Sequence, residues 1–283
     1  MARVAIVADS NAYLSPKLEQ QLGVHVVPHQ IHLPQGVFQE GENLSPGQYF
    51  RLLEQAEHGF LPRASGPSME TFLELYTRLH KQTDQILSLH PSTHLSQAVE
   101  MARAARRMLL GRCRIEVIDT ETTSVGLGLL VQAAAVAART GHNLDDCVRL
   151  VRGMMPHIYL FFLVKDLPYL ERAQRISPAQ SLLGTLLGIM PLLQLEEGQI
   201  IPLEKVRSSA RGVDKLFDYV SEFASLQRAT ILHRGFETET AELIQRLEAT
   251  HPGQKFPALT CNPSLAVHLG TEALGVVVLE GIG

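Results

Sequence analysis

The sequence contains no tryptophan, and aromatic residues make up only 6% of its 283 positions. Proteins that bind single-stranded nucleic acid stack the bases on aromatic side chains and line their grooves with basic residues. This chain instead carries a formal net charge of −4 when its 12 histidines are counted as neutral. The shortage of aromatic residues and the absence of a basic excess together argue against a nucleic-acid partner.

Cysteine is scarce as well. Cys113, Cys147 and Cys261 are widely spaced, and no Cys-x-x-Cys pair occurs. An odd number without paired spacing argues against a disulfide framework or a zinc ribbon, and it is typical of a reducing compartment. No signal segment precedes the first strand, and the longest apolar runs, 126–138 and 158–164, are too short to cross a bilayer. We therefore expect a cytoplasmic location.

Signatures of several common catalytic sites are missing. The chain has no G-x-S-x-G nucleophile elbow, no H-E-x-x-H motif and no G-x-x-x-x-G-K-[ST] phosphate loop. His25, His29 and His32 have a spacing typical of metal ligands, but on an extended strand His32 points away from the other two. We predict no metal, no cofactor and no catalytic residues, as in a binding protein or a subunit whose chemistry a partner supplies.

Two further patterns allow both a functional and a structural interpretation. Asp9, at the end of the first apolar strand, is placed like a phosphatase nucleophile. However, Asn11 stands where that chemistry needs a second carboxylate, so a turn or a helix cap is the simpler interpretation of Asp9. Gly126 and Gly128 form a lone G-x-G, which is a weak nucleotide signal and which close helix packing explains equally well.

The chain is, by contrast, rich in loops of small hydroxyl residues that lead into helices. Residues 65–68, 92–96 and 122–124 each precede an amphipathic stretch, and the last two follow short apolar strands. In a parallel α/β sheet such loops gather at one edge, where ligands bind. Helix N-termini present unpaired N–H groups and partial positive charge, so hydroxyl donors beside them suit a carboxylate or a phosphate.

Two residues of these loops are the best candidates for contact with an acidic ligand. Ser65 is predicted to be a helix N-cap, with Pro67 in the first turn and Gly66 allowing a ligand close to the backbone. The loop at 92–96 offers three hydroxyls although one cap needs only one, and Ser96 is nearest to the helix start. That excess favours a site over a simple cap.

Strand and helix patterns alternate through the first half of the chain. Strands are predicted over 3–8, 24–33, 85–89 and 114–118, and helices over 17–21, 46–55, 69–80, 98–110 and 125–138. Such alternation predicts a parallel sheet with right-handed crossovers.

The second half has a more mixed pattern and is predicted to form another domain. A buried strand at 158–164 is followed by helices, by a hairpin around residues 196–199 and by a last strand at 274–279. We predict an α/β protein with a parallel-sheet domain at 1–155 and a smaller mixed α/β domain at 156–283. His268 follows an apolar run that we interpret as extended, and imidazole exchanges a proton near neutral pH.

Several short segments form a recognisable series when they are taken in order. They are Ala8-Asp9-Ser10, residues 63–68, 92–96, 124–128 and 170–177, Lys205-Val206-Arg207 and His268-Leu269-Gly270. This series resembles the DegV family of fatty-acid-binding proteins over nearly the whole chain. No single segment is decisive, but the order and spacing of the segments are specific.

The resemblance implies a two-domain α/β fold with a long-chain fatty acid buried between the domains. It implies that Ser65, Ser96 and His268 bind the fatty acid carboxylate. Members of the family are the acyl-carrying subunits of an ATP-dependent fatty acid kinase, which phosphorylates the bound carboxylate, and such a ligand is compatible with transient membrane contact. Three cationic residues are expected near the head group or on the surface that docks the partner: Arg175, Lys205 and Arg207.

The chain departs from the family pattern at the threonine of the T-S-x-P-S loop, which is Ala64 here, and we expect Ser65 to replace that donor. Burying an alkyl chain contributes about 0.8 kcal/mol per methylene, whereas a buried carboxylate requires donors. Aliphatic residues expected in the pocket walls are Leu182, Leu183, Leu186, Leu187 and Ile189.

Two other functions fit the same residues. A small-molecule enzyme acting on a phosphorylated or carboxylated metabolite would use Asp9 and the hydroxyl loops at the same sheet edge. A regulatory protein would hold the lipid only as a structural plug. Extraction of a polar metabolite, or turnover abolished by Asp9→Asn, would favour the enzyme.

Overall fold

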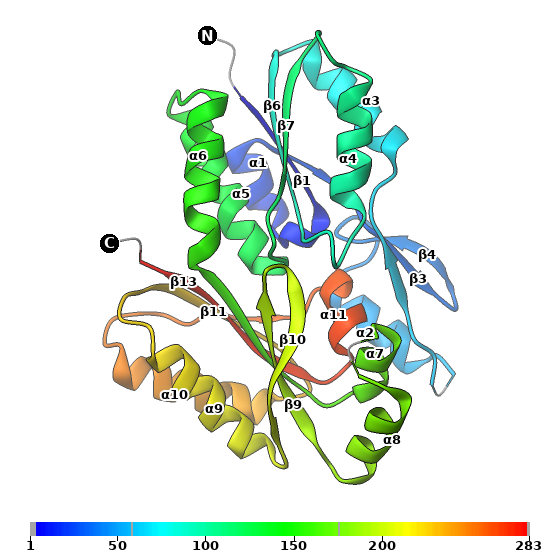
Figure 1. The fold of residues 1–283 in the computed structure, drawn as a ribbon, viewed down its shortest axis with the longest axis vertical. Coiled ribbons are helices and arrows are strands. Elements are labelled where there is room, and N and C mark those ends of the chain that lie inside the picture. Colours follow the sequence, from blue (N-terminus) through cyan, green and yellow to red (C-terminus); the bar gives the residue numbers. More distant parts are fainter. Residues whose placement is uncertain (1–3, 58, 175, 282–283) are drawn as a thin grey trace. The chain divides into compact units, whose positions relative to one another are not determined.

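The computed structural model describes residues 4–57, 59–174 and 176–281 (Figure 1). The chain divides into unit 1, comprising Met1–Ser45 and Arg63–Pro156, and unit 2, comprising Pro46–Pro62 and His157–Gly283. The main division therefore falls within one residue of the expected position. The sequence did not predict that Pro46–Pro62 belongs to the second unit, and because it does, the two units are similar in length rather than unequal.

A four-stranded parallel sheet forms the centre of unit 1. Its strand order is β2 (Val24–Val27), β1 (Ala5–Asp9), β6 (Gln85–His90) and β7 (Arg114–Asp119). Every neighbouring pair is parallel, as the alternating pattern predicted. The loops that follow these strands therefore leave from the same edge of the sheet.

Helices cover both the sheet and one another in unit 1. They are α1 (Pro16–Leu22), α3 (Met69–His80), α4 (Ala98–Arg107), α5 (Ser124–Arg139) and α6 (Leu144–Met154). The side chains of Phe72 and Tyr76 on α3 are buried against α4 and the sheet, on the face that their spacing predicted. Helix α6 was not predicted, although Asn143 caps it and acidic residues follow in its first turn.

A small antiparallel sheet completes unit 1. Strand β3 (Gln30–Leu33) lies between β4 (Gly36–Gln39) and β5 (Arg63–Ser65). The single strand predicted over 24–33 is therefore wrong, because β2 and β3 belong to different sheets. Pro28 has no N–H for a sheet ladder, and the buried His29 side chain lies against Asp9 instead.

Unit 2 is built on a six-stranded mixed sheet. The order is β10 (Gln199–Val206), β9 (Met190–Glu196), β8 (Ile158–Val164), β13 (Ala273–Glu280), β11 (Leu226–Arg234) and β12 (Ala258–Thr260). Only β11 and β12 are parallel to each other. The predicted hairpin joins β9 to β10. This unit is thus the mixed α/β part of the fold.

Helices α9 (Ser209–Ser221) and α10 (Glu237–Thr250) lie side by side against the unit 2 sheet (Figure 1). Their apolar faces share one core with residues of β8, β11 and β13. Helix α2 (Pro46–Glu54) is held to β11 by Arg234, whose guanidinium lies 5.0 Å from the Phe50 ring centroid and 2.5 Å from Glu54. Across the described residues, no helix is both long and apolar enough to cross a membrane.

Shorter helices of unit 2 carry the remaining segments of interest. These are α7 (Leu167–Arg172), α8 (Pro178–Leu186) and α11 (Pro263–Leu269). His268 therefore lies on a helix, and our interpretation of this run as extended was wrong. The local signals of a helix were present, since Pro263 occupies its first turn and Gly270 ends it with a positive φ of 95°.

Candidate functional site

Ser65 is the last residue of β5, and its side chain contacts the neighbouring strand. The Ser65 Oγ–His32 Nε2 distance is 2.9 Å, and both side chains are half-buried. The β3–β5 register makes this a diagonal contact on one face of the small sheet. His32 is therefore part of the surroundings of Ser65, which the sequence pattern did not indicate.

The helix cap in this loop is Ser68, not Ser65 as we predicted. The Ser68 hydroxyl accepts a hydrogen bond from the backbone N–H of Thr71 at 3.2 Å, and α3 begins one residue after Ser68. Pro67 precedes the helix instead of standing in its first turn. Because Ser65 belongs to the β5 ladder, its hydroxyl is not used to cap α3.

Ala64 and Ser65 point to opposite faces of β5. Ala64 is paired with Ile31 and Ser65 with Gln30, and successive side chains in a strand alternate between faces. The hydroxyl of Ser65 therefore does not point where a side chain at position 64 would.

Ser96 and the Ser65-Gly66 segment come together at the start of α4. A Cβ atom added to Gly66 would lie 2.9 Å from Ser96 Oγ and 3.2 Å from the backbone nitrogen of Ala98. Only glycine lets the two segments approach this closely. Ser96 Oγ accepts a hydrogen bond from Ala98 N at 3.2 Å, whereas Gln97 gives the helix no side-chain cap. Two predicted ligand segments thus meet at one helix N-terminus.

The donors of the third hydroxyl loop, residues 122–124, are hydrogen-bonded within the protein. Asn11 Oδ1 accepts hydrogen bonds from Thr123 Oγ1 and from the backbone N–H of Ser124, both at 2.8 Å, at the start of α5. A Cβ atom at Gly128 would lie 2.4 Å from the carbonyl oxygen of Ala12. Close packing therefore accounts for the lone G-x-G, and this helix start is sealed by Asn11.

Asp9 lies at the carboxyl end of β1 between two histidines, and all three side chains are buried. Asp9 Oδ2 is 3.0 Å from His90 Nδ1, and Asp9 Oδ1 is 3.3 Å from His29 Nε2. Asp9 Oδ1 also accepts a hydrogen bond from Asn11 N, so the capping interpretation of Asp9 is confirmed. With an exposed fraction of 0%, Asp9 offers no access to a substrate, which argues against a nucleophile.

The electrostatics of this cluster follow from burial and from its opposite charges. Burial by itself would raise the pKa of Asp9, but His29 and His90 outweigh it and lower that pKa to about 2. Burial would likewise lower the pKa of His29, but the adjacent Asp9 and Glu40 raise it above its usual value. The cluster is therefore a buried carboxylate between two imidazoles, in which Asp9 and Glu40 favour the protonated form of His29.

A chain of hydrogen bonds extends from Asp9 through β6 to α3. His90 Nε2 lies 2.7 Å from Ser88 Oγ, and the Tyr76 hydroxyl donates to Ser88 Oγ at 2.7 Å. The His90 ring also packs edge-on against Phe72, with centroids 4.9 Å apart. Sequence reasoning missed this network, because its members are 81 positions apart at the widest and stand singly among apolar residues.

His268 belongs to unit 2, in the last turn of α11. The guanidinium of Arg172 donates to the carbonyl oxygens of Val267 and Pro62, which fixes the turn that bears His268. The residues that follow α11 are held by Asp166. Its Oδ2 atom accepts hydrogen bonds from Thr271 N and Oγ1, both at 2.6 Å, and from Glu272 N at 3.1 Å. Both ends of the segment around His268 are thus held by charged side chains.

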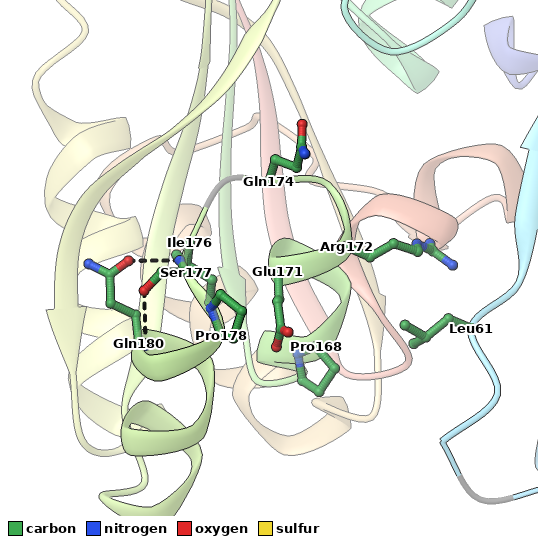
Figure 2. A pocket seen from close by; sticks show the side chains of 9 residues that line it. All are labelled: Leu61, Pro168, Glu171, Arg172, Gln174, Ile176, Ser177, Pro178 and Gln180. Atoms are coloured by element: carbon green, nitrogen blue, oxygen red, sulfur yellow. Dashed lines mark hydrogen bonds between the residues drawn. The ribbon is translucent and has the colours of Figure 1, made fainter.

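Of the three expected cations, Lys205 and Arg207 are exposed at the end of β10 and just after it, and Arg175 lies outside the described residues. The turn between α7 and α8 borders a cavity of about 720 Å³ (Figure 2). Arg172 and Leu61 line one part of it, and the capping box of Ser177 and Gln180 at the start of α8 lines another.

The leucines of α8 do not form buried walls, contrary to our prediction. Leu182, Leu183, Leu186 and Leu187 are 57–73% exposed, and Ile189 is half-buried. The buried face of α8 consists of small residues, Ser181 and Gly184. A Cβ atom at Gly184 would lie 2.5 Å from Leu167 Cδ1, so close contact with α7 requires the small face and turns the leucines outward.

These arrangements limit the chemistry of the site. In the described part of the chain, no group of three His, Cys, Asp or Glu side chains is placed to hold a metal ion. The groups gathered at the start of α4 are the Ser96 hydroxyl and backbone N–H groups, which bind an anion by donating hydrogen bonds. Fold and candidate site together define an α/β protein in which hydrogen-bond donors suited to a small acidic group lie at one helix N-terminus.

The chain belongs to the DegV family, whose model, described as "Uncharacterised protein, DegV family", matches residues 3–281. Protein DegV of Bacillus subtilis is 28% identical over 277 residues, covering 96% of this chain and 98% of that protein. A DegV domain-containing protein of Streptomyces coelicolor is 34% identical over 280 residues, covering 97% and 98%. The family resemblance seen in the sequence is thereby confirmed.

Solved structures agree with this assignment over the full length. A fatty-acid-binding DegV family protein from Thermus thermophilus has a TM-score of 0.84 at 29% identity, covering 99% of this chain and 100% of that one. DegV of Bacillus subtilis, a fatty acid binding protein, has a TM-score of 0.86 at 26% identity with the same coverage. A fatty acid binding DegV protein from Streptococcus agalactiae reaches 0.88 at 26% identity, covering both chains fully.

Proposed function

We propose that this protein binds a long-chain fatty acid, holds its carboxylate with Ser65, Ser96 and His268, and presents it to an ATP-dependent fatty acid kinase that forms the acyl phosphate. The protein itself then needs no cofactor and performs no catalytic step. The observation that carries the proposal is the meeting of the Ser65-Gly66 segment with Ser96 at the start of α4. The full-length likeness to fatty-acid-binding structures supports it.

The carboxylate end of the ligand sets the strictest requirement. A carboxylate taken out of water needs hydrogen-bond donors, and the N-terminus of a helix adds favourable partial charge. The Ser96 hydroxyl lies beside the backbone N–H groups of α4, and a second hydroxyl, that of Ser65, stands one residue before Gly66. His268 adds an imidazole from a segment held by Arg172 and Asp166.

The alkyl end supplies most of the affinity, since each buried methylene contributes about 0.8 kcal/mol. Such a ligand comes from and returns to lipid, so transient membrane contact is part of the proposal. The exposed leucines of α8 support it, because apolar side chains gathered on one helix face suit a lipid surface. Leu186→Ser is expected to reduce co-sedimentation with phosphatidylglycerol vesicles and to leave thermal unfolding unchanged; Val37→Ser, at another exposed apolar side chain, is the control.

The kinase step is expected to use Arg175, Lys205 and Arg207, near the head group or on the docking surface. Incubation of the loaded protein with a bacterial fatty acid kinase and ATP should yield acyl phosphate. Absence of product from loaded protein would instead favour the lipid as a structural plug.

Native mass spectrometry after gentle purification is the direct test of lipid binding. We expect a bound mass corresponding to a fatty acid, and saturable uptake of oleate or palmitate after delipidation. A protein that is purified empty and ignores both acids would contradict the proposal. Extraction of a polar metabolite instead would favour the small-molecule enzyme.

Ser96→Ala tests the assignment of the carboxylate site. Loss of a hydroxyl that binds a charged group costs about 1.5–3 kcal/mol, so oleate should bind at least tenfold more weakly. Thr93→Ala is the matched control, because its hydroxyl in the same loop donates to Asp119 at 2.7 Å. Equal oleate affinity of the wild-type protein and Ser96→Ala would count against the site.

A further inference from the structure

The buried polar network of unit 1 is connected along the chain to the two hydroxyl segments of the candidate site. Asp9, Tyr76, Ser88 and His90 are completely buried, and His29 is nearly so. None of them is therefore available to touch a ligand. Buried polar groups are costly unless they are all satisfied, so a network of this length calls for an account of what it holds in place.

One arm of the network leads from Asp9 to Ser96. His90, the last residue of β6, donates from its ring Nδ1 to Asp9, and the loop that follows β6 contains Ser96. The His90 carbonyl oxygen accepts hydrogen bonds from Thr120 Oγ1 at 2.7 Å and Thr120 N at 3.1 Å, so main chain and side chain are both fixed at this point. Ser96 N then donates to the carbonyl oxygen of Ser92 at 3.0 Å.

The other arm leads from Asp9 to Ser65. The His29 ring forms an ion-pair contact with Asp9 through Nε2, and the His29 backbone N–H donates to Ser10 Oγ at 2.9 Å. Ser10 Oγ in turn donates to Glu40 Oε2 at 2.6 Å. The next residue after His29 begins β3, the strand whose His32 contacts Ser65. One carboxylate therefore joins the starts of both hydroxyl-bearing segments.

We propose that Asp9 is a positioning residue for fatty acid recognition, which holds Ser96 through His90 and Ser65 through His29. This inference rests on the proposed function, since it concerns the same carboxylate site. It assigns to Asp9 a role in discriminating the acid group of the ligand without touching it. Side chains that support a binding group from behind have large effects, about 10- to 100-fold in affinity at metal sites.

The direction of the hydrogen bonds explains why a carboxylate is needed at position 9. A carboxylate only accepts, so His90 must present its Nδ1–H to Asp9. In the neutral imidazole, Nε2 is then an acceptor for the Ser88 hydroxyl. Ser88 can in turn accept from Tyr76, so every member of the chain is satisfied. An asparagine has the same shape but offers an N–H₂ group, which favours the other tautomer of His90 and reverses the chain.

The test compares two ligands with the same chain, oleate and oleyl alcohol, on the full-length protein. For Asp9→Asn we expect oleate to bind at least about tenfold more weakly, while the affinity for oleyl alcohol changes less than about threefold. A purely structural role would weaken both ligands equally, and that result would overturn the proposal. Asp145→Asn, which removes an exposed carboxylate paired with Arg114 in the same unit, is the control.

A second variant and a spectroscopic measurement keep the test decisive if Asp9→Asn folds poorly. His29→Gln removes only the arm toward Ser65, and we expect a smaller loss for oleate and none for the alcohol. ¹H–¹⁵N spectra of the imidazole rings should show the Nδ1–H tautomer of His90 in the wild-type protein, and the other tautomer there would overturn the proposal. If the wild-type protein does not bind oleate, the proposed function is wrong as well. If both variants bind oleate as tightly as the wild type, only the role of Asp9 is wrong.

Discussion

Each unit fastens a segment of the candidate site with one aspartate at the end of a strand, but the two aspartates have different partners. Asp9 is the last residue of β1, is fully buried and contacts two imidazoles. Asp166 follows β8, is half-buried and binds two backbone N–H groups and a threonine hydroxyl. The first cluster joins one carboxylate to two imidazoles, whereas in the second cluster one carboxylate accepts from groups that do not titrate. Unit 1 therefore holds its segments of the candidate site through three titratable side chains, and unit 2 holds its segment through one.

The largest expected difference between the two anchors is in stability. Asp9→Ala removes the carboxylate that two buried histidines contact, and removal of one partner of a buried pair typically costs about 3–5 kcal/mol. Asp166→Ala removes three hydrogen bonds at a half-buried position, and we expect a loss of about 1–3 kcal/mol. Urea unfolding at pH 7 measures both free energies. An equal or larger loss for Asp166→Ala would break the comparison.

The pH dependence of stability should separate the anchors next. The pKa of Asp9 is lowered to about 2, so its stabilisation is present above its ordinary value and lost as the pH falls toward 2, by about 2 kcal/mol. The pKa of His29 is raised, so its stabilisation is present below about pH 6.5 and lost as the pH rises through the raised value. Thermal unfolding between pH 2.5 and 9 measures both limbs of the profile, the loss of stability at acidic pH and the loss at higher pH.

Two variants provide the controls for that profile. Asp9→Asn should flatten both limbs, because it removes one titrating group and the partner of the other. Asp166→Asn should leave both limbs as they are in the wild-type protein. A profile of Asp9→Asn that matches the wild type would show that other groups dominate the pH dependence.

The smallest expected effect on stability comes from Gly66→Ala. The added methyl group would press on Ser96 Oγ and on the backbone at Ala98, and we expect a loss of about 1 kcal/mol. Oleate affinity should fall more clearly than stability, since the methyl group separates the two hydroxyl segments. Gly153→Ala is the matched control, because no atom lies within 4 Å of its added Cβ and alanine favours a helix. Unchanged oleate binding by Gly66→Ala would place the ligand elsewhere.

Much of the fold could be predicted because its elements follow simple periodicities. Residues 69–80 and 158–164 were predicted with the bounds they have, as α3 and β8. The failures have physical causes. The break at Pro28 depends on the attraction of His29 to a distant carboxylate, and α8 buries Ser181 and Gly184 rather than its leucines. A hydrophobic pattern indicates which face is apolar, but not whether a close helix contact needs small side chains instead.

The candidate site was predictable only in part for a related reason. Hydroxyl-rich loops are visible in the sequence, and Ser96 indeed stands at a helix start beside Gly66. The sequence does not show which helix N-termini are already hydrogen-bonded within the protein. At α5 the acceptor is Asn11, which is 112 positions away from Thr123. The same holds for His32 and Asp9, whose partners are chosen by the tertiary fold.

The assignment of Pro46–Pro62 to unit 2 means that the backbone passes between the units three times. A fragment that ends at residue 156 would contain α2 but not the rest of unit 2, against which α2 packs. The buried side chains of Tyr49, Phe50 and Leu53 would then be exposed to solvent. During synthesis, α2 can contact β11 only after more than a hundred further residues have been made. Each unit consists of two separate segments of the chain, so neither unit can be expressed as one continuous segment.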